Sequence, residues 1–433
     1  MLKRKIDDAL KEWKRKKDKL PLIVQGGRQV GKTTSIINFG ENNYSKFYKI
    51  NFIETPSAIE AFRGDLSPIA IMARLSLVIP GFIIEDGNTL IFLDEIQECP
   101  EARTALKFLS SAKNVDIIAS GSLLGIKYKN VVSYPAGYVD YLTMYPMDYE
   151  EFLWANGIQE QVIENLKDCF GRRAKVDNFV HSRLLELFRT YLVVGGMPRA
   201  VESYKETNNF SIVQEIQRAI MKDYELDIIK YADCNEKQKI RSCFLSIPRQ
   251  LAKENRKFQY SVVEKGSSAR KYSSSILWLS DANVANFCHN LSTLELPLKA
   301  YEEEKDFKVY LADTGLLTSQ YEDGTALDII TDNIGRHKGA IYENAVAQML
   351  TAKGYRLYFF KPSQNMEIDF IIRFEGYVCP VEVKSSDNTR SKSLSSLLSS
   401  GKYSIKKAIR LSTKNIGEEN GIISLPIYLA FLL

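Results

Sequence analysis

The chain has 433 residues, about three times a typical domain length, so two to four domains are expected. Its 45 % hydrophobic and 26 % charged residues are ordinary for a soluble globular chain and exclude disordered, collagen-like and disulfide-stapled classes. Six widely spaced cysteines without a CxxC pair, and only three histidines, exclude the common zinc motifs and favour reduced thiols in the cytoplasm. The hydropathy of the sequence predicts neither a membrane-spanning segment nor a signal peptide.

The net charge of +5 is unevenly distributed along the chain. Residues 1–20 carry nine Lys/Arg against four Asp/Glu, and residues 335–433 carry fourteen against eight, so the residues between them are net acidic. Basic ends can bind polyphosphate or nucleic acid, and an ordinary solvated surface explains the same charges equally well.

Strands and helices alternate through the first third of the chain. A helix over 2–19 is followed by a strand at 21–25, a glycine-rich turn and a helix to residue 39. Further strands are expected at 47–53, 89–93, 115–120 and 139–144, with helices at 57–80 and 100–112. This alternation predicts an α/β fold with a doubly wound parallel sheet over 1–146.

The pattern changes after residue 147. Helices are predicted over 147–235, and then a winged-helix-like domain over 236–320, because a helix at 272–286 precedes two strands that flank a charged loop, Glu302–Asp306. A polar linker over 322–337 leads to a C-terminal α/β domain over 335–433. Its predicted elements are a helix at 339–352, strands at 355–360, 367–374 and 377–384, and a Ser/Lys-rich stretch at 385–404.

A glycine-rich loop stands between the first strand and its helix and fits the pattern GxxxxGK[ST]. The glycines let backbone N–H groups curl around a phosphate, and the helix that starts there points its positive dipole end at the same oxygens. Lys32 is expected to reach the β- and γ-phosphates of ATP, and Thr33 to bind Mg²⁺. The loop and expected ATP-binding residues are Gly26, Gly27, Arg28, Gln29, Val30, Gly31, Lys32, Thr33 and Thr34.

Two later strand ends supply candidates for the rest of this site. Asp94 is expected to hold the water shell of Mg²⁺ and Glu95 to polarise the attacking water, although adjacent carboxylates can also cap the next helix. Ser120 or Ser122 is expected to hydrogen-bond the water or the γ-phosphate, and a simple strand-to-loop turn explains these serines equally well.

Together these motifs resemble the prokaryotic AAA-type ATP-binding proteins in which a P-loop domain precedes a long C-terminal domain of unknown function. The motifs that carry the resemblance are GGRQVGKTT at 26–34, LDEIQE at 93–98, Ser120-Gly121-Ser122, Tyr145-Pro146 with Glu150-Glu151-Phe152, Gly195-Gly196-Met197-Pro198, and Asp313-Thr314-Gly315-Leu316-Leu317. The resemblance implies an ATP-binding core, a helical segment, a winged-helix-like segment and a nuclease-like end.

One position departs from the family pattern. Where the family usually has Gly-Arg ahead of the Tyr-Pro motif, this chain has Gly137-Tyr138. If the family arginine completes the γ-phosphate site, hydrolysis here is slow or another arginine substitutes. Arg28 and Arg199 are the candidates, and the sequence does not choose between them.

A second group of candidate residues lies in the last hundred residues. Alternation along a strand puts Glu382 and Lys384 on one face, and a hairpin can bring Asp369 beside them. Two carboxylates sharing a divalent metal, with a lysine to orient water, suit phosphodiester hydrolysis, and Glu343 on the preceding helix could add a ligand. These four residues resemble the PD-(D/E)XK nuclease motif. Cross-strand ion pairing explains the same string, and a metal-free remnant that binds DNA or a protein is the competing reading.

The sequence therefore predicts a cytoplasmic, Mg²⁺-dependent ATPase that uses ATP to drive a conformational switch on or near DNA. An ATP-gated DNA nuclease and an ATP-sensing protein scaffold remain as alternatives. Salt-dependent DNA binding separates the first two from the scaffold. AAA-type sites are often completed by a neighbouring subunit, so the resemblance also implies a homo-oligomer.

Overall fold

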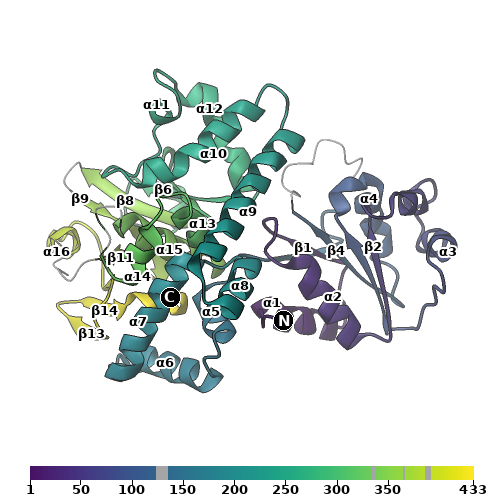
Figure 1. The fold of residues 1–433 in the computed structure, drawn as a ribbon, viewed down its shortest axis with the longest axis horizontal. Helices are drawn as coiled ribbons and strands as arrows, with labels where there is room; N and C mark the ends of the chain where they lie inside the picture. Colours follow the sequence, from purple (N-terminus) through teal and green to yellow (C-terminus); the bar gives the residue numbers. More distant parts are fainter. Residues whose placement is uncertain (123–134, 334, 336–337, 364–365, 386–391) are drawn as a thin grey trace. The chain divides into compact units, whose positions relative to one another are not determined.

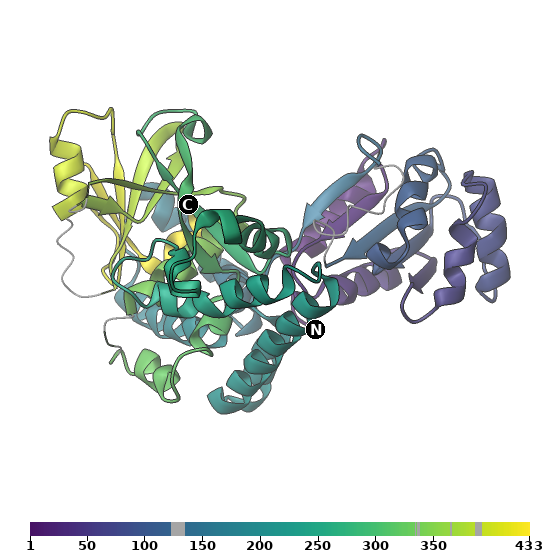
Figure 2. The same cartoon turned by 90° about the horizontal axis from the view of Figure 1, so that it is seen from above.

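The computed structural model describes residues 1–122, 135–333, 335, 338–363, 366–385 and 392–433 (Figures 1 and 2). It divides into two compact units. The first contains Met1, residues 3–145 and residues 281–283, and the second contains Leu2, residues 146–280 and residues 284–433. Within the described residues, no helix combines the length and apolarity that crossing a bilayer requires.

The first unit is built on a five-stranded parallel sheet, in the order β2-β3-β4-β1-β5 (Figure 1). Its strands are β1 Leu22–Gln25, β2 Lys46–Asn51, β3 Thr89–Asp94, β4 Asp116–Gly121 and β5 Asp140–Thr143. Its helices are α1 Lys5–Arg15, α2 Lys32–Asn43, α3 Pro68–Val78 and α4 Pro100–Leu109, with short 3-10 helices η1 Pro56–Phe62 and η2 Ile96–Glu98.

Both faces of this sheet are covered, because its strands are apolar on both sides. Leu22 and Val24 of β1 pack with α1 and α2 on one face, whereas Ile23 packs with η1, α3 and α4 on the other. The same division recurs in β3, where Phe92 and Ile91 belong to opposite cores. The unit therefore has the doubly wound α/β fold of P-loop ATPases, as the sequence predicts.

The second unit begins with helices and continues as an α/β structure. Its helices are α5 Tyr149–Ala155, α6 Glu160–Arg172, α7 Asn178–Val194, α8 Pro198–Thr207, α9 Phe210–Tyr231, α10 Lys237–Leu251, α11 Tyr260–Val263, α12 Ala269–Asp281, α13 Thr314–Thr318, α14 Thr325–Ile330, α15 Lys338–Ala352 and α16 Lys392–Ser399, with 3-10 helices η4 Leu298–Tyr301 and η5 Ile427–Leu432. Helix α15 is buried along most of its length, which makes it the central helix of this unit.

Two sheets complete the second unit. One has the order β7-β6-β8-β9 and the other β10-β11-β12-β14-β13. Their strands are β6 Ala285–Leu291, β7 Glu302–Leu311, β8 Leu357–Ser363, β9 Met366–Ile368, β10 Phe370–Phe374, β11 Tyr377–Val383, β12 Ala408–Ser412, β13 Gly417–Glu419 and β14 Ile422–Pro426. Because β6 pairs with β8, residues 285–311 share a sheet with the C-terminal residues instead of forming a separate wing. The structure thus gives the winged-helix prediction no support.

Several element predictions in the second half of the chain are wrong in detail. The helix predicted at 272–286 ends at Asp281, because Asn283 adopts a left-handed conformation (φ 56°) and the Val284 amide bonds back to Leu279. The predicted charged loop at 302–306 is the start of β7, an edge strand on which acidic side chains remain accessible to cations.

The predicted linker and one predicted strand also differ. The segment taken for a linker contains α14, whose Ala326 and Ile329 are buried. The strand predicted at 367–374 is divided into β9 and β10 at Asp369. In the first unit, the helix predicted at 57–80 is divided into η1 and α3, because Gly64 (φ 75°) and the Ser67-Pro68 helix start interrupt it.

Candidate functional site

The glycine-rich loop lies between β1 and α2, as predicted. Gly26 has φ 145° and Gly31 has φ 98°, conformations that L side chains rarely adopt. A Cβ on Gly26 would also lie 2.0 Å from the carbonyl oxygen of Met144, so only glycine fits there. The Lys32 ammonium lies against the loop's own backbone, 3.0 Å from the carbonyl oxygen of Gly26 and 2.7 Å from that of Gly27.

Burial changes the acidity of this lysine. Lys32 is 8 % exposed, and burial lowers its pKa to about 8, although the negative charges of Glu95 and Asp94 oppose the fall. The ammonium is therefore mostly charged at neutral pH and loses its proton in mildly alkaline solution.

The Asp94 carboxylate accepts hydrogen bonds from several polar side chains at the carboxyl end of the sheet. Its Oδ1 accepts hydrogen bonds from Thr33 (3.1 Å) and Ser120 (2.5 Å), and its Oδ2 accepts one from Asn51 (3.2 Å). The Lys49 ammonium lies 3.9 Å from Oδ2. Hydroxyl and carboxylate oxygens are ligands suited to Mg²⁺ or its water shell, so Thr33 and Asp94 fit the predicted ion.

Ser120 and Asn51 hold positions that the sequence did not predict for them. The Ser120 hydroxyl donates to Asp94 instead of being directed toward a phosphate, so in this structure it positions the carboxylate. Asn51 was not predicted as a site residue. It ends β2, which neighbours β3, and a polar residue at the carboxyl end of a parallel strand is the signal that could have identified it.

Glu95 follows Asp94 in a left-handed conformation, with φ 55°. A non-glycine residue in this region is strained by about 1–2 kcal/mol, and such residues concentrate at functional sites. The side-chain amide of Gln97 donates a hydrogen bond to its carboxylate. The turn separates Glu95 from the strand and leaves its side chain partly exposed, whereas Asp94 is buried.

Two of the motifs that carry the resemblance, at 195–198 and 313–317, meet beside Met147 in a buried node of the second unit. The Gly196 amide donates to Asp313 (2.5 Å), and the Gly196 carbonyl accepts from Met147 (2.7 Å). Burial raises the pKa of Asp313 to about 6, and its hydrogen bonds with backbone amides limit the rise. A Cβ on Gly195 would meet Oδ1 of Asp313 at 2.3 Å. These motifs therefore fix the start of the second unit instead of contributing reactive groups.

The predicted nuclease-like residues are brought together only in part. The Asp369 Oδ2 accepts a hydrogen bond from the Val383 amide (2.8 Å), and Lys384 lies 2.5 Å from Oε1 of Glu382. Burial raises the pKa of Glu382, the nearby Asp369 adds to the rise, and Lys384 opposes it. Among the described residues, no donor reaches Oε2 of Glu382.

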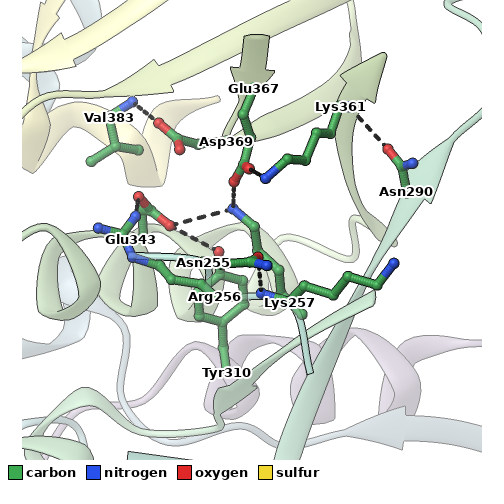
Figure 3. Close-up of polar contacts among 11 residues, drawn as sticks. Asn255, Arg256, Lys257, Asn290, Tyr310, Glu343, Lys361, Glu367, Asp369 and Val383 are labelled. Carbon is green, nitrogen blue, oxygen red and sulfur yellow. Dashed lines mark hydrogen bonds and ion pairs between the residues drawn. The ribbon is translucent and has the colours of Figure 1, made fainter. Parts of the chain in front are cut away.

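Glu343, the predicted additional ligand, belongs to a different network (Figure 3). Its carboxylate contacts Arg256, accepts a hydrogen bond from the Tyr310 hydroxyl (3.1 Å) and lies 3.7 Å from the Lys308 ammonium. The described residues contain no group of three or more His, Cys, Asp or Glu side chains arranged to hold a metal. In this structure Glu343 is paired with Arg256 and Lys308, and metal binding by Glu343, Asp369 and Glu382 stays a prediction.

Lys308 is the centre of this network, and the sequence did not single it out. Its side chain is 1 % exposed, and its ammonium lies 2.6 Å from Oε1 of Glu367. Burial opposes ionisation of Glu367, but Lys308 and Lys361 outweigh this effect and lower its pKa to about 2. Lys308 comes from β7, so no local pattern around residues 367–384 could have revealed it.

Comparison with family models assigns parts of the chain. Residues 18–153 match an AAA domain, whereas residues 185–325 and 338–429 match two domains of unknown function, DUF8612 and DUF4143. The comparison with curated proteins found no match. Most of the first unit is therefore similar to an AAA domain.

Solved structures give distant similarities. A Walker-type ATPase of Pyrococcus abyssi is 15 % identical, covering 74 % of this chain and 96 % of that chain, with a TM-score of 0.43. The ORC1 protein of Aeropyrum pernix, in complex with DNA, is 13 % identical, with coverages of 76 % and 91 % and a TM-score of 0.28. AMPPCP-bound DnaA of Aquifex aeolicus is 14 % identical, with coverages of 64 % and 86 % and a TM-score of 0.28.

Proposed function

We propose that the first unit binds ATP with Mg²⁺ and hydrolyses it to ADP and phosphate, and that this reaction switches the conformation of the second unit. One observation carries the proposal: Thr33 of the P-loop helix and Asp94 at the end of β3 share a hydrogen bond beside Lys32 and Glu95. This arrangement supports the proposal that a phosphate-binding loop, a metal position and a base share one end of the sheet.

The chain's own residues divide the chemistry between them. The ammonium of Lys32 exchanges the carbonyls of Gly26 and Gly27 for phosphate oxygens, which carry more negative charge. Glu95 accepts a proton from water as the water oxygen bonds to the γ-phosphorus, and the bond from that phosphorus to the bridging oxygen of ADP breaks. Thr33 and Asp94 would hold Mg²⁺, which would neutralise charge on the phosphates.

The lowered pKa of Lys32 predicts that ATP binding weakens in alkaline solution. Phosphate binding favours the charged ammonium, so binding takes up a proton wherever the free lysine is neutral. Between about pH 7 and about pH 9, the Kd for ATP with Mg²⁺ is expected to rise about tenfold. The measurement is a calorimetric titration at the two pH values.

Lys32→Arg is the matched control for this titration, because its guanidinium stays charged throughout the range. Its Kd, whatever its absolute value, is expected to be nearly the same at both pH values. A wild-type Kd that does not change with pH, or one that changes equally in Lys32→Arg, would show that Lys32 does not carry the phosphate contact.

We further propose that the protein acts on or near DNA, that it forms a homo-oligomer, and that an arginine completes its γ-phosphate site. The basic residues in 1–20 and 335–433 support action on or near DNA, in the cytoplasm. Arg28 and Arg199 are both exposed residues and stay the candidates for the arginine that completes the γ-phosphate site.

A second candidate function is metal-dependent hydrolysis of a nucleic-acid backbone by the C-terminal residues. The unpartnered Oε2 of Glu382, buried beside Asp369, favours it, because a divalent cation would satisfy this oxygen and offset the repulsion of the two carboxylates. Asp369 and Glu382 would hold the ion, which supplies an activated water, and Lys384 would orient that water. Glu343 is not needed in this proposed site, because it is paired with Arg256 and Lys308.

Binding of Mn²⁺ tests this second candidate without depending on catalysis. Electron paramagnetic resonance of the Lys32→Ala, Asp94→Ala background is expected to detect one Mn²⁺ per chain, and Asp369→Asn with Glu382→Gln is expected to lower its affinity more than about tenfold. Glu418→Gln, which alters an exposed carboxylate, is the control. Absence of Mn²⁺ binding in the background protein would leave cross-strand ion pairing as the role of these residues.

A further inference from the structure

Arg4 is a buried arginine just ahead of helix α1. Its guanidinium forks between two backbone carbonyls of the first unit: Nη1 donates to Val30 (2.7 Å) and Nη2 donates to Tyr145 (2.8 Å). The residue is only 5 % exposed, and its own amide is anchored on the Asp7 carboxylate (3.0 Å). The planar fork of arginine holds two acceptors in a fixed geometry, which a single ammonium cannot do.

The first of these carbonyls belongs to the P-loop. The Val30 oxygen and the Gly31 amide are parts of one planar peptide unit, and this bond is not among the cis peptides. In a trans peptide the C=O and N–H groups point in opposite directions. By fixing the Val30 carbonyl on one side, Arg4 therefore directs the Gly31 amide to the other side. Amides of such a loop are the donors that bind phosphate oxygens.

The second carbonyl lies where the chain leaves the first unit. Tyr145 is followed by Pro146, the first residue of the long segment assigned to the second unit. Its neighbour Met144 contacts the beginning of the P-loop. The Met144 amide donates a hydrogen bond to the Gln25 carbonyl (2.7 Å), and the Met144 carbonyl lies so close to Gly26 that a Cβ there would not fit. On the other side of Pro146, Met147 is bound in the node around Gly196. Both ends of the P-loop are thus linked to residues 144–145.

We propose that Arg4 is a positioning residue that orients the Gly31 amide for phosphate and couples phosphate binding to the Tyr145–Pro146 junction. The inference rests on the proposed ATP binding. It assigns the Tyr-Pro motif a role, because the Tyr145 carbonyl accepts the hydrogen bond from Arg4. When phosphate bonds to the Gly31 amide, the same peptide unit moves or tightens at its carbonyl, and Arg4 transmits that change to the Tyr145 carbonyl. The coupling is detected as a change at the Tyr145–Pro146 junction when phosphate binds to the P-loop. An arginine with only a structural role would alter the stability of the protein without linking the junction to the P-loop.

Hydrogen–deuterium exchange with Mg²⁺ and saturating AMPPCP, a non-hydrolysable ATP analogue, tests the proposal. In the wild type, the analogue is expected to slow exchange at least about tenfold both in P-loop amides and in amides of residues 143–148. In Arg4→Met, P-loop protection is expected to persist at saturation while junction protection is lost. Lys11→Gln, which changes an exposed lysine of the same helix, should behave as the wild type.

Arg4→Lys is a second variant, included in case Arg4→Met does not fold. It keeps the buried positive charge and lacks only the planar guanidinium that reaches both carbonyls. It is expected to lose most of the junction protection, with unchanged exchange in strands β3 and β4 as the evidence of folding. Full junction protection in a folded Arg4→Lys or Arg4→Met would overturn the coupling while leaving ATP binding intact. A wild type whose P-loop amides show no protection would instead remove the proposed ATP binding, and the inference with it.

Discussion

Replacing Glu95 by glutamine is expected to lower the turnover of ATP about 100- to 1,000-fold, because a general base contributes that much to a rate. The amide keeps the size and hydrogen-bonding shape of the carboxylate but cannot accept a proton from water. Since Lys32, Thr33 and Asp94 are untouched, the Kd for ATP is expected to stay close to that of the wild type. Steady-state phosphate release and a separate binding titration measure the two quantities.

Glu98→Gln is the matched control, because it removes a partly exposed carboxylate of the same acidic turn. It is expected to keep the wild-type kcat. The Glu95 side chain makes no capping hydrogen bond to the backbone of the helix that follows it, so the structure does not support the capping alternative. If Glu95→Gln weakened ATP binding and left kcat unchanged, Glu95 would contribute to binding and would not be the general base.

Replacing Gly196 by alanine is expected to destabilise the protein by about 3 kcal/mol, the upper end for overpacking a buried site. The new Cβ would lie 2.0 Å from the carbonyl oxygen of Met147, so the backbone must shift. That carbonyl also accepts hydrogen bonds from Tyr191 (2.9 Å) and Gln348 (3.4 Å), and a shift would weaken both. Chemical denaturation followed by far-UV circular dichroism measures the loss.

Gly171→Ala provides the opposite expectation in the same unit. Gly171 lies near the end of α6, is exposed, and has nothing within 4 Å of an added Cβ. Alanine there is expected to stabilise the protein by about 0.5–1 kcal/mol, because it favours the helix and restricts the unfolded chain. Equal stability of Gly196→Ala and the wild type would show that the node around Met147 yields easily, against the packing described above.

The first unit could be predicted from sequence because its signals are local. Runs such as Leu90–Leu93 mark strands buried on both faces, and the P-loop pattern includes its own strand and helix. The order of the strands, β2-β3-β4-β1-β5, has no local signal. For this reason Asn51 was missed: it reaches Asp94 only because β2 lies beside β3.

The second unit was harder to predict because its contacts join distant parts of the chain. The strand that begins at Glu302 looked like a loop, since its charges are balanced by residues far away, such as Arg356 and Lys257. Lys308 neutralises Glu343 and Glu367 from a separate strand, and no spacing in the sequence announces that contact. Gly196 and Asp313 each belong to a recognisable motif. The hydrogen bond between them spans 117 residues, and neither motif alone predicts it.

Phosphate release from ATP with Mg²⁺ shows whether the first unit is a working ATPase, as proposed above. The assay compares the wild type with Glu95→Gln, each with and without duplex DNA. We expect the wild type to release phosphate and to release it faster with DNA, and we expect Glu95→Gln to lose both properties. A wild type that binds ATP and releases no phosphate under either condition would contradict this proposal, and Tyr138 in place of the family arginine would then mark an ATP-sensing protein that does not hydrolyse its ligand.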